Sequence, residues 1–240
     1  MWMICKKEWQ QFFSSLTGYI ALIIFLLLTG LFLFVFPDTS LLDFGYASLN
    51  GFFDLVPWIL LFLIPTITMR SLADEYKSGT FETLKTKPLS VAQIVWGKFF
   101  GALLIVISAV ITTIIYAVSI QVLSNTGGID VAATAGSYIG LLFLSAVFTA
   151  VGICTSSFTN NTVVAFIAGA FVCFLLYTGF EAISKLPVLK GGWDYYTEMA
   201  GINFHYKSLS KGVIDTRDVI YFSGLIVLFL LITQRNLLRK

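Results

Sequence analysis

The sequence predicts an all-α membrane protein with six transmembrane helices, and its composition and charge spacing carry that prediction. Of its 240 residues, 58% are hydrophobic and only 12% are charged, whereas a soluble domain carries about 25% charged residues. No charged residue lies between Glu8 and Asp38, between Lys98 and Asp130, or between Asp130 and Glu181. Because a helix needs about 20 apolar residues to cross the hydrocarbon core, these gaps predict one, one and two spans.

Residues 1–15 predict an amphipathic helix that lies along the membrane interface. Apolar and aromatic side chains, Trp9 among them, alternate there with charged side chains that include Lys6 and Lys7, which is typical of helices in the interface plane. The first span follows at residues 16–36. It is longer than the apolar core of a cleaved signal peptide, which has about 7–15 residues, so we expect it to be retained.

The other spans complete a single domain over residues 1–240. The second has too few residues between Asp54 and Arg70 to cross at about 1.5 Å per residue, so we expect it to begin near Gly51. A polar tight turn is predicted at residues 156–161, and residues 181–217 form a long, aromatic-rich outer loop that we expect to hold short helices dipping into the outer leaflet. The five later spans are predicted at residues 51–69, 97–123, 137–155, 162–180 and 219–234.

The distribution of basic residues predicts the orientation. Six spans place both termini on one side, and cytoplasmic loops carry the excess of Lys and Arg. Of the 15 basic residues, ten lie on the same side of the membrane as the two termini. The other five all lie in the loop 181–217. We therefore expect a multi-pass membrane protein with both termini in the cytoplasm. The cytoplasmic set would be Lys6, Lys7, Arg70, Lys77, Lys85, Lys87, Lys98, Arg235, Arg239 and Lys240.

The loop of residues 70–96, between spans two and three, has the most specific local pattern. Gly79 can end one helix and Thr80 can cap the start of another, while Pro88 stops continuation. These residues predict a short helix on the cytoplasmic surface. Because rigid corners join it to two spans, force applied to this helix would move both; a solvated connector is the alternative interpretation.

A second helix start is predicted at Ser90. Ser90 and Gln93 have the spacing of a capping box, and Leu89 and Ile94 have that of the hydrophobic staple around it. We expect this helix to run into the third span.

These residues also resemble a known family. The stretch DEYKSGTFETL at residues 74–84, followed by PLS at 88–90 and VWGKF at 95–99, is similar to the ordered signature of type-2 ABC exporter permeases. The interfacial helix, six spans, long last outer loop and basic tail are similar too, so the resemblance covers essentially the whole chain. Within the family, the likeness is closest to the gliding-motility permeases.

The resemblance implies a transporter subunit rather than an enzyme. In this family a coupling helix docks in a groove of a separate cytoplasmic ABC ATPase, which binds ATP and Mg. A second permease subunit, identical or different, pairs with the first, and gliding-type relatives have an auxiliary membrane subunit. The residues implied for the ATPase contact or its scaffold are Glu75, Gly79, Thr80, Phe81, Glu82, Leu84 and Pro88. Those implied for the outer gate are Glu181, Tyr195 and Tyr196.

Other functions fit the residues less well. The sequence lacks the G-x-x-x-x-G-K-[ST] phosphate loop, so we expect no nucleotide cofactor in this chain, and a net charge of +2 gives no reason to expect nucleic acid. The charge-poor spans disfavour a secondary carrier or membrane enzyme, and His205 has no supporting metal ligands nearby. A non-transporting scaffold of a motility or secretion complex stays open. Two Gly-x-x-x-Gly pairs, Gly97/Gly101 and Gly136/Gly140, predict close helix packing within one subunit or between subunits.

Overall fold

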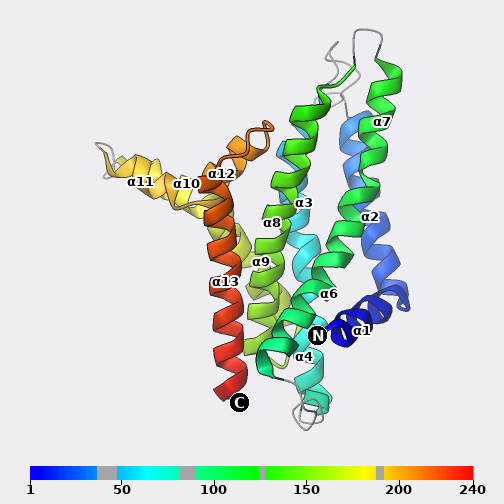
Figure 1. The fold of residues 1–240 in the computed structure, drawn as a ribbon, viewed down its shortest axis with the longest axis vertical. Helices are drawn as coiled ribbons and strands as arrows, with labels where there is room; N and C mark the ends of the chain where they lie inside the picture. Colours follow the sequence, from blue (N-terminus) through cyan, green and yellow to red (C-terminus); the bar gives the residue numbers. More distant parts are fainter. Residues whose placement is uncertain (37–47, 82–89, 125–127, 188–191, 240) are drawn as a thin grey trace.

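The computed structural model describes residues 1–36, 48–81, 90–124, 128–187 and 192–239, and every regular element among them is a helix. Six helical segments in these ranges are long and apolar enough to cross a membrane, as predicted. They run side by side, and both termini lie at the end that is lowest in Figure 1, here called the lower end. The six segments are Leu16–Phe34, Asn50–Lys77, Val91–Leu123, Val131–Phe158, Thr162–Ser184 and Thr216–Arg239.

Helix α1 (Trp2–Phe13) lies across the lower end of the bundle and precedes the first span, α2 (Leu16–Phe34). The chain turns sharply between them at Ser15, whose hydroxyl oxygen accepts a hydrogen bond from the Gly18 amide at 3.2 Å. An N-cap of this kind satisfies one of the first free amides of α2. The predicted interfacial segment is therefore a separate helix with a defined corner.

The second span continues past its predicted end. Helix α3 (Asn50–Thr68) contains two prolines and is followed, after Met69, by α4 (Arg70–Lys77). The segment from residue 50 to residue 77 is long enough to cross and to extend beyond the bundle, which removes the length problem seen in the sequence. Gly79 follows the end of α4 and has φ +71°, a left-handed conformation that favours glycine. Gly79 as a helix-ending residue is thus confirmed.

The helix that forms the third span begins at the predicted start signal, Ser90, which lies earlier than the predicted span at residues 97–123. Ser90 caps helix α6 (Val91–Thr112): its side chain accepts from the Gln93 amide and the Gln93 side chain accepts from the Ser90 amide, both at 3.2 Å. This confirms the capping box. Helix α7 (Ile114–Leu123) follows directly after Thr113. The predicted staple residue Leu89 lies outside the described residues.

Helix α8 (Val131–Phe158) is the centre of the bundle and is longer than predicted at both ends. Asp130, assigned to a loop in the sequence, caps it by accepting from the amides of residues 132 and 133 at 3.0 Å. At the other end, Ser156 and Ser157 are helical and buried. The predicted turn over 156–161 is therefore wrong in its first half, because Ser156 bonds to α4, as described below, and Ser157 accepts a hydrogen bond from the Asn236 side chain at 3.0 Å.

The fifth span is not a uniform α-helix. It consists of α9 (Thr162–Phe174), a π-helical turn η1 (Leu175–Gly179) and α10 (Phe180–Ser184). Two short helices follow, α11 (Trp193–Met199) and α12 (Ile202–Leu209), before the last span α13 (Thr216–Arg239). In Figure 1, α10 and α11 extend sideways from the bundle near its upper end.

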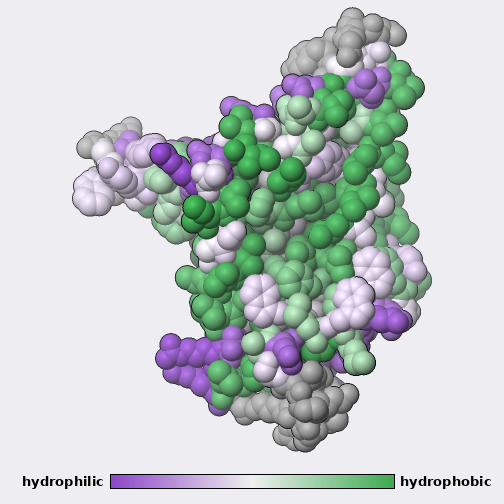
Figure 2. All heavy atoms as spheres, in the orientation of Figure 1, coloured by the Kyte–Doolittle hydropathy of each residue, from purple (hydrophilic) through white to green (hydrophobic). Residues whose placement is uncertain are grey.

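The outer surface of the bundle is apolar. Figure 2 shows an apolar band between polar regions at the two ends. A contiguous apolar surface of this size indicates contact with lipid or another apolar partner rather than with water. Together with the six apolar helices, it makes the chain a multi-pass membrane protein. On α9 alone, the exposed apolar side chains are Val163, Val164, Ile167, Phe171 and Phe174.

Candidate coupling site at the lower end of the bundle

A buried charge cluster joins three helices at the lower end. Lys98 on α6 places its Nζ 2.8 Å from Glu8 Oε1 on α1 and 2.9 Å from Glu75 Oε1 on α4. It also donates to the Ser71 carbonyl oxygen at 2.6 Å. The Lys98 side chain is only 1% exposed. We call Lys98, Glu8 and Glu75 the Lys98 cluster.

The bonding of Lys98 accounts for its burial. An ammonium group has three donors, and here three oxygen acceptors meet them. Taking an ion out of water costs several kcal/mol unless partners and hydrogen bonds offset the loss, so the cluster requires α1, α4 and α6 to stay together. Sequence reasoning used Lys98 only in the orientation count and within the family signature at residues 95–99, and it gave Glu8 no role. The available signal was a lysine beside a long apolar run, because an ionisable group near or inside a span needs a partner.

Helix α1 is seated on α6 by two glycines. A Cβ added at Gly97 would lie 2.9 Å from Ile4 Cβ, and one at Gly101 would lie 2.8 Å from Glu8 Cβ. Neither distance leaves room for a methyl group, so the glycines let α1 approach closely enough for Glu8 to reach Lys98. Within-subunit packing is therefore confirmed for this pair. It is also confirmed for Gly136/Gly140, which face Gly212 and Leu209 of the same chain.

The basic residues of α1 differ in their roles. Lys7 donates to Glu75 Oε1 at 3.2 Å and extends the Lys98 cluster toward the surface, whereas Lys6 is exposed.

Two other side chains of α1 are partly or fully buried. Trp9 is half-buried and packs on Phe13, with ring centroids 4.6 Å apart. Burial, and then the charge of Glu8, raise the pKa of the Cys5 thiol on the same helix.

A buried serine fixes α4 to the central helix. Ser156 on α8 accepts hydrogen bonds from the amides of Leu72 and Ala73, each at 3.1 Å, and donates to the Met69 carbonyl at 3.0 Å. These are the backbone groups freed by the break between α3 and α4. Ser156 thus caps a helix far away in sequence and holds the α4 corner on α8.

The residues implied by the resemblance fall into two described groups. Glu75 and Phe81 are buried, at 7% and 6% exposure, and Phe81 packs in an apolar cluster that includes Leu72. Their side chains therefore lie inside the bundle and not on its surface. Gly79 and Thr80 are exposed, and the Thr80 hydroxyl lies 2.9 Å from that of Ser78. Glu82, Leu84 and Pro88 lie outside the described residues.

The predicted outer-gate residues lie on two neighbouring short helices, α10 and α11. Glu181 pairs with Lys185 at 2.8 Å and with Lys207 of α12 at 3.3 Å. Tyr195 and Tyr196 lie on α11 with exposed rings that contact each other. No hydrogen bond or ion pair joins Glu181 to either tyrosine among the described residues. Glu181 is tied to α12 through Lys207, and it lies with the two tyrosines on the arm formed by α10 and α11.

The upper end buries a second ion pair that sequence reasoning missed. His205 Nδ1 lies 2.6 Å from Asp218 Oδ1, and His205 Nε2 lies 3.0 Å from the Met199 carbonyl oxygen. Both ring nitrogens therefore face oxygen atoms that can take part in hydrogen bonds. The ring stacks on Tyr221 at 4.0 Å. Among the described residues, no group of three or more His, Cys, Asp or Glu side chains could hold a metal ion.

Comparison with known proteins identifies the family. A family model described as ABC-2 family transporter protein matches residues 2–192. The chain belongs to the ABC-2 transporter family. The match runs from α1 through α10 and includes every residue of the Lys98 cluster. A search of curated proteins found no match. As an ABC-2 transporter protein with six apolar helices, the chain is the membrane component of a transporter.

Proposed function

We propose that this ABC-2 protein is the permease subunit of an ATP-driven exporter in the bacterial inner membrane. In this proposal the segment Gly79–Pro88 is the coupling helix, and it docks on a separate ABC ATPase that binds ATP and Mg. Both termini and the lower end of the bundle face the cytoplasm. A second permease subunit completes the translocation pathway.

The observation that carries the proposal is the Lys98 cluster. It joins α4, which leads into the coupling segment, to α6, which leads out of it, and to the interfacial helix α1. Phe81, near the start of the segment, packs in an apolar cluster with residues of α4 and α6. Displacement of the segment would therefore be passed to spans two and three as one body, because breaking a buried ion pair costs about 3–5 kcal/mol.

The likeness to gliding-motility permeases extends the proposal to a role in gliding, with an auxiliary membrane subunit as a further partner. This extension rests on the sequence resemblance alone. Deleting the gene in a gliding host should then stop surface movement while leaving growth intact. Normal gliding in the deletion strain would remove this extension and leave the exporter proposal untouched.

Copurification with the ATPase tests the docking step. The tagged wild-type chain, co-expressed with ABC ATPases of the same genome, should retain one of them. Gly79→Val combined with Glu82→Arg should abolish retention, whereas Lys211→Glu at the other end of the bundle should not. Equal recovery of the ATPase with wild type and with a scrambled Gly79–Pro88 segment would contradict the proposal. ATPase binding without ATP-dependent export in proteoliposomes would favour a scaffold instead.

Cysteine labelling tests the orientation. All three natural cysteines are buried, and the raised pKa of Cys5 keeps its thiolate fraction low, so background labelling should be slow. A cysteine introduced at the exposed Thr80 should react with an impermeant maleimide only in inverted membrane vesicles. One at the exposed Lys211 should react only in intact spheroplasts. The reverse pattern would overturn the proposed topology.

A further inference from the structure

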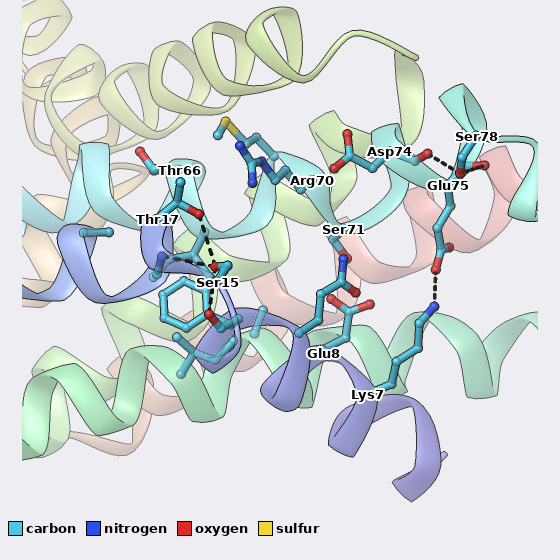
Figure 3. Close-up of a pocket in the computed structure, with 18 of the residues that line it drawn as sticks. Lys7, Glu8, Ser15, Thr17, Thr66, Arg70, Ser71, Asp74, Glu75 and Ser78 are labelled. Carbon is cyan, nitrogen blue, oxygen red and sulfur yellow. Dashed lines mark hydrogen bonds and ion pairs between the residues drawn. The ribbon is translucent and has the colours of Figure 1, made fainter.

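A cavity of about 470 Å³ lies beside the Lys98 cluster, bounded by α1, α2, the α3–α4 segment and α6. Figure 3 shows it from close by, with Glu8 and Lys7 on one side and the residues of α4 on another. Its volume falls within the range of about 300–1,000 Å³ that is common for small-molecule sites. No partner proposed above occupies it.

The lining of the cavity changes along the bundle axis. Toward the membrane-spanning part, its walls are side chains of three spans, including Ala21, Ile67 and Ile105. At the lower end the walls are polar and come mainly from α1 and α4. A space that is apolar beside the spans and polar at the bundle end matches an amphiphile with its polar group at the membrane surface.

The charges on the polar wall indicate the kind of headgroup. Lys7, Glu8 and Glu75 also line the cavity, but they already belong to the ion pairs around Lys98. Arg70 and Asp74 line it one helical turn apart on α4 and make no ion pair with any described residue. One cation and one anion are therefore available side by side, which fits a zwitterion better than an anionic ligand.

Two buried atoms beside this wall lack partners. Ser71 Oγ and Glu75 Oε2 have no hydrogen-bond partner among the described residues. Both residues line the cavity and are more than nine-tenths buried. A buried carboxylate oxygen without a donor is costly. A ligand that brings N–H donors would reduce that cost, whereas a quaternary ammonium group has no N–H to offer.

We propose that this cavity binds a zwitterionic phospholipid whose headgroup carries a primary ammonium, as in phosphatidylethanolamine. The Arg70 guanidinium pairs with the phosphate, for which its planar fork of donors is suited. The Asp74 carboxylate accepts from the ammonium, and the first carbons of one acyl chain lie along Ala21, Ile67 and Ile105. The lipid so bound would fill the space between the interfacial helix and the coupling element.

Lipid retention tests the proposal. The full-length chain is reconstituted in bilayers of equal parts phosphatidylethanolamine, phosphatidylcholine and phosphatidylglycerol, re-extracted in mild detergent, and its bound lipids are counted by mass spectrometry. Wild type should retain phosphatidylethanolamine roughly tenfold over phosphatidylcholine, the ratio that about 1.4 kcal/mol produces. Asp74→Asn should make the retention of these two lipids equal. Arg70→Gln should lower the retention of both.

Matched variants separate the cavity from the general membrane surface. Ala21→Leu fills the apolar half without touching the Lys98 cluster, and it should lower retention of every lipid. Lys77→Gln removes an exposed charge of α4 outside the cavity and should leave the lipid ratio as in wild type. Thermal unfolding of each variant, measured in the same detergent, identifies any variant that is misfolded. In that case the result for Arg70→Gln, which changes an exposed side chain, is used in its place.

Four results would overturn the proposal. One is an unchanged lipid ratio in Asp74→Asn. A second is unchanged lipid retention in Ala21→Leu, which would show that the lipid binds elsewhere. A third is preference for phosphatidylglycerol, which would indicate cationic attraction alone. The last is displacement of lipid by equimolar O-phosphoethanolamine, which has the headgroup without chains and would assign the cavity to a soluble ligand.

Discussion

The two ends of the bundle each bury an ion pair, and the pairs join different parts of the chain. At the lower end, Lys98 bonds to Glu8 across 90 residues of sequence and gathers α1, α4 and α6. At the upper end, His205 bonds to Asp218 across 13 residues and holds the α11–α12 corner on α13. The lower pair thus fixes the relative positions of spans, whereas the upper pair fixes a local hairpin.

This difference indicates which end passes movement to the whole bundle. A cluster that links distant spans makes them move together, and its loss should loosen the fold broadly. A pair within one hairpin should affect that hairpin alone. Single substitutions at the two ends can separate these two kinds of effect.

Lys98→Met should have the largest effect. It leaves Glu8 without its cation and Glu75 with the exposed Lys7 as its remaining partner. Removing one partner of a buried ion pair costs about 3–5 kcal/mol, so the thermal unfolding temperature measured in detergent should fall. Adding Glu8→Gln and Glu75→Gln to Lys98→Met should recover much of the loss, because no buried charge then remains unpaired. A Lys98→Met variant with the same unfolding temperature as wild type would contradict the structural role of the cluster.

Asp218→Asn should act locally. It removes a charge-assisted hydrogen bond that contributes about 1.5–3 kcal/mol, so hydrogen exchange should speed up in α11 and α12. Exchange in α1 should stay as in wild type. Faster exchange at both ends would show that the upper pair also holds spans together, and the contrast drawn above would fail.

Gly101→Ala should displace α1 from α6. Its new methyl group would meet Glu8 Cβ at 2.8 Å, and such overpacking costs about 1–3 kcal/mol. Proteolysis within α1 should become faster. Gly224→Ala on α13 is the matched control, since nothing lies within 4 Å of a Cβ there. Equal protection of α1 from proteolysis in the two variants would count against its close packing on α6.

Lys185→Gln should have the smallest effect, below what thermal unfolding detects. Lys185 is exposed and pairs with Glu181 one turn away, and surface pairs of this kind contribute little. Hydrogen bonding to Glu181 raises the pKa of Lys185. The interaction is therefore present at neutral pH and is lost only as the pH rises through that raised value. A clear drop in unfolding temperature would mean that Glu181 is more than a surface partner.

Local signals in the sequence predicted the helices and several of their ends. Apolar run lengths located the six spans, and the capping box at Ser90 and the helix-ending Gly79 depend only on neighbours. Asp130 offered an equally local signal, an acid directly before an apolar run, that was interpreted as a loop. Its side chain caps α8, so the span begins earlier than hydrophobicity alone suggests.

The contacts that make the candidate site could not be predicted in the same way. Glu8, Glu75 and Lys98 are separated by tens of residues, and one sequence gives no indication of which acid meets which base. Ser156 was assigned to a polar turn, because its partners are backbone amides of α4 that are freed only by the break at Met69. Over Leu175–Gly179 the sequence analysis predicted part of one continuous span, whereas the structure has a π-helical turn.

The most direct test of the account is a photo-crosslinking residue placed at Thr80 in living cells. Thr80 is exposed beside the Lys98 cluster, at the start of the proposed docking segment. The account predicts a crosslink to an ABC ATPase from Thr80 and none from Lys211 at the opposite end. A Thr80 probe that crosslinks to no protein, or that reacts with reagents confined to the outside of the cell, would contradict it.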